Sequence, residues 1–262
     1  MSDAHDLHRF THDGHVVHIE LNRPARLNAF TVGAITALKS RIDAIAADPA
    51  IRVVTMRGAG KAFSTGVDLK EFPKDGMGPD RIDAWEGMLR TIETMDKLVV
   101  CLIHGYAVGG GLQLALACDI RVCATGAKVG LPANKEGIIP GLATYRLARY
   151  VGLGRAKQLI YLGNLIDAAR AEQIGLVDHL VDEDGRLDAF NELVKTYDQA
   201  FSNGARCAKP LLAECLHSDF ESFFELYKLQ QNKAVESPDF IEAQAAYRDG
   251  REATWDGTRE TN

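Results

Sequence analysis

The chain has 262 residues, of which 46% are hydrophobic and 25% are charged. These proportions are typical of a folded globular protein and exclude a disordered or fibrous chain, and the length suits one large domain. The 30 basic and 36 acidic residues give a net charge of -6 and form no basic stripe interleaved with aromatic side chains. A nucleic-acid partner is therefore not expected.

The cysteine pattern and the apolar runs indicate a cytoplasmic protein. The first ten residues are polar and lack the apolar segment of a secretory signal, and the longest apolar runs are too short to cross a membrane. The cysteines are odd in number and include no Cys-x-x-Cys pair, which argues for reduced thiols rather than a disulfide framework. They are Cys101, Cys118, Cys123, Cys207 and Cys215.

The first half of the chain alternates strand and helix patterns. Strands are expected at 16–21, 53–57, 99–103 and 120–124, and the third is continuously apolar, as in parallel strands covered on both faces. Helices are expected after an N-cap at Thr31, through a periodic stretch at 82–92, and at 112–118 directly after three glycines. This order predicts an α/β architecture.

The C-terminal quarter has only helical patterns. After about Arg186 an amphipathic helix is expected, followed by helical stretches broken at Pro210 and Pro238. We therefore divide the chain into a core at 1–185 and a helical region at 186–262. Within the core, the segment Phe72–Asp80 is rich in Gly, Pro and charge, which predicts a mobile loop able to gate a site.

Two glycine-containing turns follow expected buried strands, at 58–70 and 104–113. In the second, three glycines let the backbone approach a ligand closely, and the helix that opens there directs its N–H groups and positive dipole end toward that ligand. If the first turn adds an N–H, two donors converge on one carbonyl oxygen and stabilise an enolate or a tetrahedral anion. Ordinary tight turning is the alternative interpretation.

Other glycine motifs fit less well. Gly60-Lys61 is followed by Ala62 rather than Ser or Thr, so it is not a phosphate-binding P-loop, and no Gly-x-Gly-x-x-Gly occurs. The stretch Ala62-Phe-Ser-Thr-Gly66 differs by one residue from a nucleophile elbow, which leaves a serine hydrolase using Ser64 as a minor alternative.

Five segments together resemble the crotonase superfamily, also called the enoyl-CoA hydratase/isomerase family. They are Asn22–Ala29, Ala62–Glu71, Gly105–Gly111, Ala117–Asp119 and Gly137–Gly141. The resemblance implies a spiral of β-β-α units followed by a helical C-terminal trimerisation region. It also implies a homotrimer or a dimer of trimers, an acyl-CoA thioester substrate, and no cofactor, since CoA is part of the substrate.

The same resemblance implies roles for individual residues. The backbone N–H groups of Val67 and Gly110 would polarise the thioester carbonyl, and Arg26 and Leu27 would lie near the adenine and phosphates of CoA. Trp255 falls where family members often place an aromatic residue that reaches a CoA site, sometimes that of a neighbouring subunit. A packed C-terminal aromatic is the alternative for Trp255. Asp68 and Asp119 are expected to have packing roles.

Two positions depart from the pattern of the family's hydratases. Where those enzymes carry two catalytic glutamates, this chain has Gln113 and Ala133. General acid–base help contributes roughly 10²–10⁴-fold per group, so efficient hydration of a double bond is not expected. Gln113 and the segment Leu131–Gly141 resemble instead the cofactor-independent dioxygenase branch, which oxidises arylacetyl-CoA esters with O₂ as co-substrate. That branch carries an extra N-terminal helical region, which is absent from this sequence.

The sequence leaves open which residue is the general base. Glu136 is one candidate, with an ion pair to Lys135 or Arg146 as the alternative, and His104 is a second, with a histidine bonded to backbone as the alternative. No metal site is expected, because the histidines near the N-terminus have no joining ligands and no fixed geometry. We expect an enzyme that oxygenates or isomerises an activated acyl-CoA, with a non-catalytic acyl-CoA-binding or assembly protein as the alternative.

Overall fold

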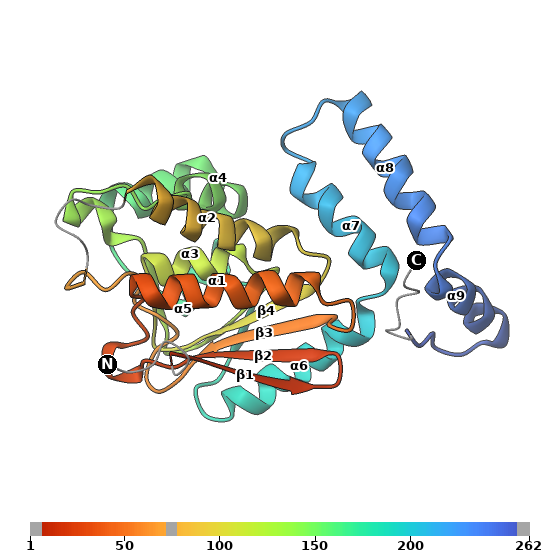
Figure 1. The fold of residues 1–262 in the computed structure, drawn as a ribbon, viewed down its shortest axis with the longest axis horizontal. Coiled ribbons are helices and arrows are strands. Elements are labelled where there is room, and N and C mark those ends of the chain that lie inside the picture. Colours follow the sequence, from red (N-terminus) through yellow and green to blue (C-terminus); the bar gives the residue numbers. More distant parts are fainter. Residues whose placement is uncertain (1–6, 72–77, 256–262) are drawn as a thin grey trace.

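The computed structural model describes residues 7–71 and 78–255, and Figure 1 traces their path. A six-stranded sheet has the order β1-β2-β3-β4-β6-β9, in which β1 is antiparallel to β2 and every other pair is parallel. The four strands expected from the sequence are confirmed in this sheet. Its strands are β1 (His8–Asp13), β2 (Val16–Leu21), β3 (Val53–Gly58), β4 (Leu98–Ile103), β6 (Ile120–Ala124) and β9 (His179–Val181).

A second, three-stranded sheet lies beyond the ends of β4 and β6. It joins β5 (Tyr106–Val108), β7 (Lys128–Gly130) and β8 (Ile166–Asp167), with β5 and β7 parallel. Each of β5 and β7 follows a strand of the large sheet after a short turn, so the chain repeats a strand–strand–helix unit. This arrangement confirms the α/β spiral of β-β-α units.

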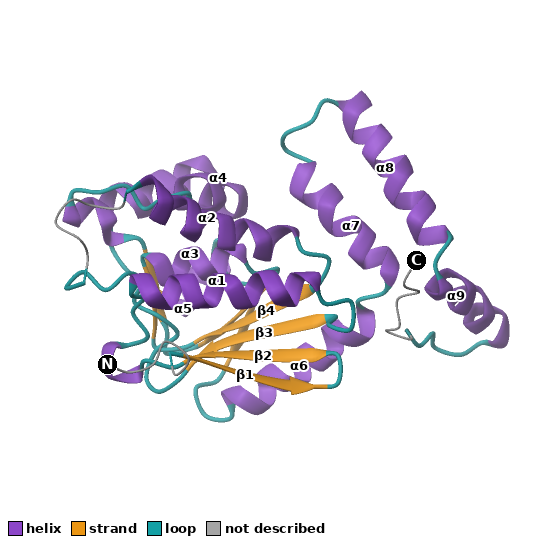
Figure 2. Ribbon diagram, in the orientation of Figure 1, coloured by secondary structure: helices purple, strands orange, loops and turns teal. Residues whose placement is uncertain are grey.

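Helices cover one face of the large sheet (Figure 2). The side chain of Thr31 accepts a hydrogen bond from the Ala34 N–H at 3.1 Å, which confirms the expected N-cap. The loop expected at Phe72–Asp80 lies partly outside the described residues, and its last two residues begin α2 instead. The helical elements before β9 are η2 (Pro24–Arg26), α1 (Val32–Ala47), α2 (Pro79–Thr94), α3 (Gly110–Ala117), η3 (Pro132–Glu136), α4 (Ala143–Leu162) and α5 (Ala168–Gln173).

Helix α6 (Arg186–Ala200) covers the opposite face of the sheet. Its buried Phe190 and Val194 form a second apolar core with Val100 and Val122 of the sheet. The packing therefore joins α6 to the core. Helices α7 (Asn203–Glu214), α8 (Phe220–Val235) and α9 (Pro238–Asp249) extend away from it (Figure 1). No helix in the described part of the chain combines the length and apolar character that a membrane span needs.

The expected helix break at Pro210 is wrong, because α7 continues through this residue. The neighbouring Lys209 holds the helix in place: its Nζ donates to the carbonyl oxygen of Lys97 at 2.8 Å and to Asp119 Oδ2 at 2.7 Å. Tertiary contacts of this kind override local propensity. Burial raises the pKa of Asp119 while the Lys209 ammonium opposes that rise. Pro238, by contrast, is the first residue of α9, as a helix boundary there requires.

The stability of the fold should fall as the pH drops from 6.5 toward 4, because His8 is buried uncharged. Its ring stacks near Phe30, and burial lowers its pKa to about 4. Between these pH values the unfolded chain binds a proton that the native state does not, so the free energy of unfolding decreases on acidification. At about 1.4 kcal/mol per pKa unit, the loss is roughly 3 kcal/mol.

The measurement is urea unfolding at pH 6.5 and pH 4.5 for the wild type and His8→Phe. The variant should lose much less stability between the two pH values. His12→Phe serves as the matched control, because His12 is exposed on the same strand and should keep the wild-type pH dependence. An equal pH dependence in wild type and His8→Phe would contradict the prediction.

Candidate active site

A cavity of about 560 Å³ opens where α2, α3, η3 and the start of α4 meet. Most of its lining is apolar, which suits an apolar acyl or aryl group. Few ionisable or amide side chains reach it, namely Glu86, Gln113 and Glu136. The apolar residues of the lining are Val67, Leu69, Ile82, Trp85, Val108, Pro132, Ala133, Ile138, Ile139, Pro140 and Leu142.

Two backbone N–H groups that the sequence predicted to lie together meet at this cavity. A Cβ added to Gly66 would lie 2.6 Å from the Gly110 nitrogen, and Gly66 has a φ of +87°, so only glycine allows this approach. Gly110 opens α3, where the first N–H groups of a helix have no intrahelical partner. Among the backbone hydrogen bonds of the described residues, none uses the N–H of Val67 or of Gly110.

The segment after Gly66 is held in register by an isolated parallel bridge between Phe30 and Val67. The Phe30 N–H donates to the Gly66 carbonyl oxygen at 2.7 Å, and the Asp68 N–H donates to the Phe30 carbonyl oxygen at 2.9 Å. Arg23 binds the Asp68 carboxylate at 2.6 Å, and this hydrogen bond holds the pKa of Asp68 below its usual range. These contacts give Asp68 the packing role expected from the sequence, and they fix the Val67 N–H between them.

Gln113 and Ala133 share this cavity, although 20 positions of sequence and a strand pair separate them. The indole Nε1 of Trp85 donates to Gln113 Oε1 at 3.3 Å, which orients the amide. Trp85 also lies beside Gly110, since a Cβ on Gly110 would be 3.3 Å from its Cζ2 atom. An amide and an indole therefore line the cavity beside Gly110.

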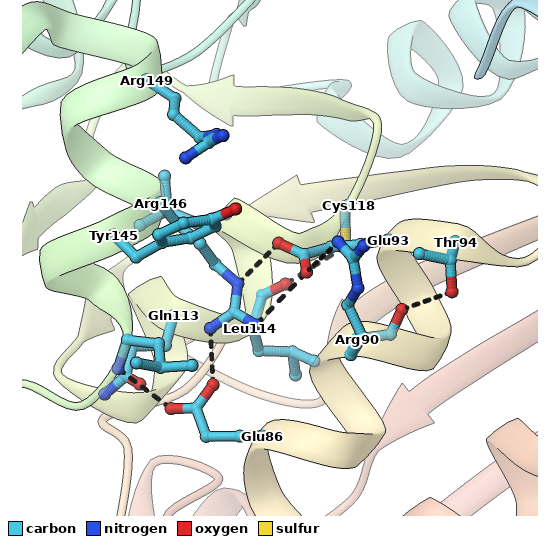
Figure 3. Close-up of polar contacts among 12 residues, drawn as sticks. Glu86, Arg90, Glu93, Thr94, Gln113, Leu114, Cys118, Tyr145, Arg146 and Arg149 are labelled. Carbon is cyan, nitrogen blue, oxygen red and sulfur yellow. Dashed lines mark hydrogen bonds and ion pairs between the residues drawn. The ribbon is translucent and has the colours of Figure 1, made fainter. Parts of the chain in front are cut away.

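Glu86 is a cavity residue that the sequence analysis missed. It follows Trp85 on α2, and its carboxylate binds the guanidinium of Arg146 from α4 at 2.7 Å (Figure 3). The other Glu86 oxygen accepts the Leu142 N–H at 3.0 Å. Arg146 is buried and also binds Glu93 at 2.6 Å. No local sequence pattern pairs α2 with α4, so only the fold could reveal this carboxylate.

Glu136 lies on η3 at the same cavity and is exposed. The alternative ion pairs expected for it are not the contacts that form: Lys135 donates to Asn164 at 2.9 Å, and Arg146 binds Glu86 and Glu93. The structure thus brings together Val67, Gly110, Gln113 and Glu136 from the predicted set.

His104 and Ser64 lie outside this cavity lining. The His104 Nε2 atom is 3.2 Å from the Gly60 carbonyl oxygen, and burial lowers the pKa of this ring. Ser64 Oγ donates to the Asn28 carbonyl oxygen at 2.8 Å and accepts the Gly66 N–H at 3.1 Å. Because this hydroxyl is buried against backbone, the geometry gives no support to a serine nucleophile.

Arg26 and Leu27 form the turn beside one edge of the cavity. Leu27 has a left-handed backbone with φ of 48°, and its carbonyl oxygen accepts the Thr65 N–H at 3.0 Å. Thr65 lines the cavity, so this hydrogen bond joins the turn to the cavity wall, although Arg26 and Leu27 are not in the lining themselves. Trp255 is not part of the lining: it follows Thr254, whose N–H donates to Glu242 of α9 at 3.0 Å.

The sequence profile of the enoyl-CoA hydratase/isomerase family matches residues 11–258 of this chain. The chain belongs to this family. YngF of Bacillus subtilis is 34% identical over 249 residues, which cover 93% of this chain and 95% of YngF. The crotonyl-CoA hydratase of Syntrophomonas wolfei is 32% identical, over 90% of this chain and 92% of that protein.

A solved structure agrees with this assignment. The enoyl-CoA hydratase of Bacillus anthracis superposes with a TM-score of 0.88 at 30% sequence identity, over 96% of this chain and all of that one. The enoyl-CoA hydratase/isomerase family acts on CoA thioesters, so the chain is an acyl-CoA-processing enzyme of the crotonase superfamily. The cavity at the start of α3 is the candidate site for its acyl group.

Proposed function

We propose that this enzyme forms an enolate from an acyl-CoA thioester and holds the charge of that enolate on the N–H groups of Val67 and Gly110. The observation that carries the proposal is the approach of Gly66 to Gly110, which sets both N–H groups at one wall of the cavity. Two such donors lower the barrier to enolate formation by stabilising the developing oxyanion, roughly 10²–10³-fold per donor.

The acyl group would fill the apolar part of the cavity, with CoA passing the turn of Arg26 and Leu27. Arg26 is exposed there and supplies a cation for the phosphates or the adenine edge. Trp255 would contribute to CoA binding from a neighbouring subunit, since its own chain holds it beside α9. No cofactor is needed in this scheme, because the thioester itself activates the α-carbon.

The reaction that follows should differ from hydration. Gln113 and Ala133 stand at the positions that resemble those of the two hydratase glutamates, and neither side chain titrates. The enolate then has two routes: reprotonation at another carbon, which is isomerisation, or reaction with O₂ as a co-substrate in the apolar cavity. The relatives named as hydratases do not decide between them.

The test is incubation of the purified protein with crotonyl-CoA and arylacetyl-CoA esters in D₂O under ¹⁸O₂, followed by mass spectrometry of the esters and released acids. Deuterium at the α-carbon is the expected result, and ¹⁸O in a product would select oxygenation over isomerisation. Rapid hydration of crotonyl-CoA would contradict the argument from Gln113 and Ala133. Saturable binding with unchanged masses would instead support a non-catalytic acyl-CoA-binding protein.

The C-terminal helices suggest how the enzyme assembles. We propose that α7–α9 pack against other copies of the chain, in a trimer or a dimer of trimers, and light scattering tests this through the mass in solution. The support is the set of large apolar side chains that these helices and the turn between α7 and α8 expose in the single chain. They include Leu212, Leu216, Phe220, Phe224, Ile241 and Tyr247.

A further inference from the structure

Glu86 has the surroundings of a carboxylate that is kept charged inside a mostly apolar cavity. Its side chain is only 14% exposed, and the buried guanidinium of Arg146 binds it at 2.7 Å (Figure 3). Burying a carboxylate is costly unless a partner compensates the charge. Arg146 supplies that compensation from the side of Glu86 that faces α4.

Both oxygens of Glu86 keep acceptor capacity. One accepts a single bond from Leu142 N–H and the other a single bond from Arg146, whereas each carboxylate oxygen has about two lone-pair sites. The two bonds come from different elements and therefore fix the position of the carboxyl plane. A carboxylate that is fixed and still able to accept a proton meets the geometric requirement for a general base.

The Glu86 carboxylate and the Gln113 amide both lie next to Gly141. A Cβ on Gly141 would lie 2.9 Å from Glu86 Oε1 and 2.7 Å from Gln113 Oε1, so both oxygens border the same small space. Gln113 is one helical turn after Gly110 on α3, and helix positions three apart share a face. The Glu86 carboxylate thus stands beside the amide that follows the proposed oxyanion site.

We propose that Glu86 is the general base of this enzyme, and that Arg146 and the Leu142 N–H are its positioning groups. The inference rests on the proposed enolate chemistry. Glu86 takes the α-proton of the acyl-CoA, the electron pair of the broken C–H bond becomes the C=C bond of the enolate, and the carbonyl oxygen takes the charge. Return of a proton or deuteron from Glu86 to carbon reverses the step.

Two other carboxylates allow the assignment to be tested closely. Glu93 binds the same guanidinium at 2.6 Å but is not among the residues that line the cavity. Glu136 lines the cavity, but it is exposed and no ion pair among the described residues holds it. Each differs from Glu86 in one of the two features that the proposal requires.

The experiment measures deuterium incorporation at the α-carbon of phenylacetyl-CoA in D₂O for wild type, Glu86→Gln, Glu93→Gln and Glu136→Gln. We expect Glu86→Gln to lower the exchange rate roughly 10²–10⁴-fold, the usual contribution of a general base. Glutamine keeps an oxygen for the Leu142 N–H, and Arg146 keeps Glu93, so the affinity for the ester should be unchanged. Glu93→Gln, which lies outside the cavity lining, should exchange at close to the wild-type rate. Glu136→Gln changes the lining and should lower the rate far less than Glu86→Gln does.

The outcomes separate this inference from the function on which it rests. Exchange in the wild type that persists in Glu86→Gln would overturn the role of Glu86 and leave the enolate chemistry intact. Loss of exchange in Glu136→Gln alone would transfer the role to that residue. No exchange in the wild type despite ester binding would overturn the proposed function, and the assignment of Glu86 with it.

Discussion

Gly110→Ala should lower α-proton exchange by about 10²–10³-fold, the effect of removing one oxyanion donor. The added Cβ would lie 3.3 Å from Gly66 Cα and 3.5 Å from the Val67 nitrogen. The methyl group would therefore press on Gly66 and move the Gly66–Val67 segment by a few tenths of an ångström, while also contacting the Val67 nitrogen. An acyl oxygen then loses its place between the N–H groups.

The same substitution should leave the fold intact. Gly110 is the first residue of α3 and does not have a positive φ, so alanine fits its backbone, and alanine is a better helix former than glycine. Gly111→Ala would be a poor choice, because its Cβ would lie 2.1 Å from the Ser64 carbonyl oxygen. Gly110→Ala therefore tests the site rather than the packing around it.

Gly33→Ala is the matched control, because a Cβ at this position of α1 meets only Thr31 Oγ1, at 3.9 Å. Its exchange rate should equal that of the wild type. The comparison uses mass spectrometry in D₂O, with thermal unfolding to confirm that each variant is folded. A folded Gly110→Ala enzyme that exchanges as fast as the wild type would rule out the proposed donor pair.

The proximity of the Val67 and Gly110 backbones was predictable because it depends on backbone turns alone, while their role as donors stays a prediction. Val67 and Gly110 each follow a glycine turn after a buried strand, and neighbouring parallel strands end at the same edge of a sheet. The side chain at each of these positions is then unimportant, and the position of the turn decides whether the two N–H groups lie close together. The resemblance to a known family supplied the pairing of the two turns.

Glu86 was not predictable in the same way. Its position depends on Arg146, which is 60 positions later in the chain and on a different helix. The pattern of α2 shows which residues face the core, yet it does not show that the N-terminus of α4 reaches the same end of the cavity. When a residue on another helix holds a carboxylate in place, the sequence around that carboxylate does not reveal the contact.

At Pro210 the opposite happened: the local sequence predicted a helix break, and the prediction was wrong. Proline lacks the N–H that a helix interior uses, which favours a boundary at this position. The structure continues the helix because Lys209 anchors α7 to the carbonyl oxygens of Lys97 and Ile92 and to Asp119.

That anchor leads to the second large expected effect. Asp119→Ala should lower the free energy of unfolding by about 3 kcal/mol, the lower end of the usual cost of breaking a buried ion pair on one side, because the Asp119 side chain is 26% exposed while Lys209 is buried. The substitution leaves the Lys209 ammonium buried with carbonyl partners alone. It also removes the acceptor of the Val99 N–H, which donates to Asp119 Oδ2 at 2.8 Å. The attachment of α7 to β4 is therefore weakened at two bonds.

The measurement is urea unfolding of the wild type, Asp119→Ala, Lys209→Met and the double variant. The double variant should be more stable than Asp119→Ala, because it no longer buries an uncompensated charge. Asp43→Ala is the control: Asp43 pairs with Lys39 on the exposed face of α1, and such a surface pair contributes less than about 1 kcal/mol. Equal losses in Asp119→Ala and Asp43→Ala would show that the buried pair does not hold α7, and that the continuity of this helix through Pro210 has another source.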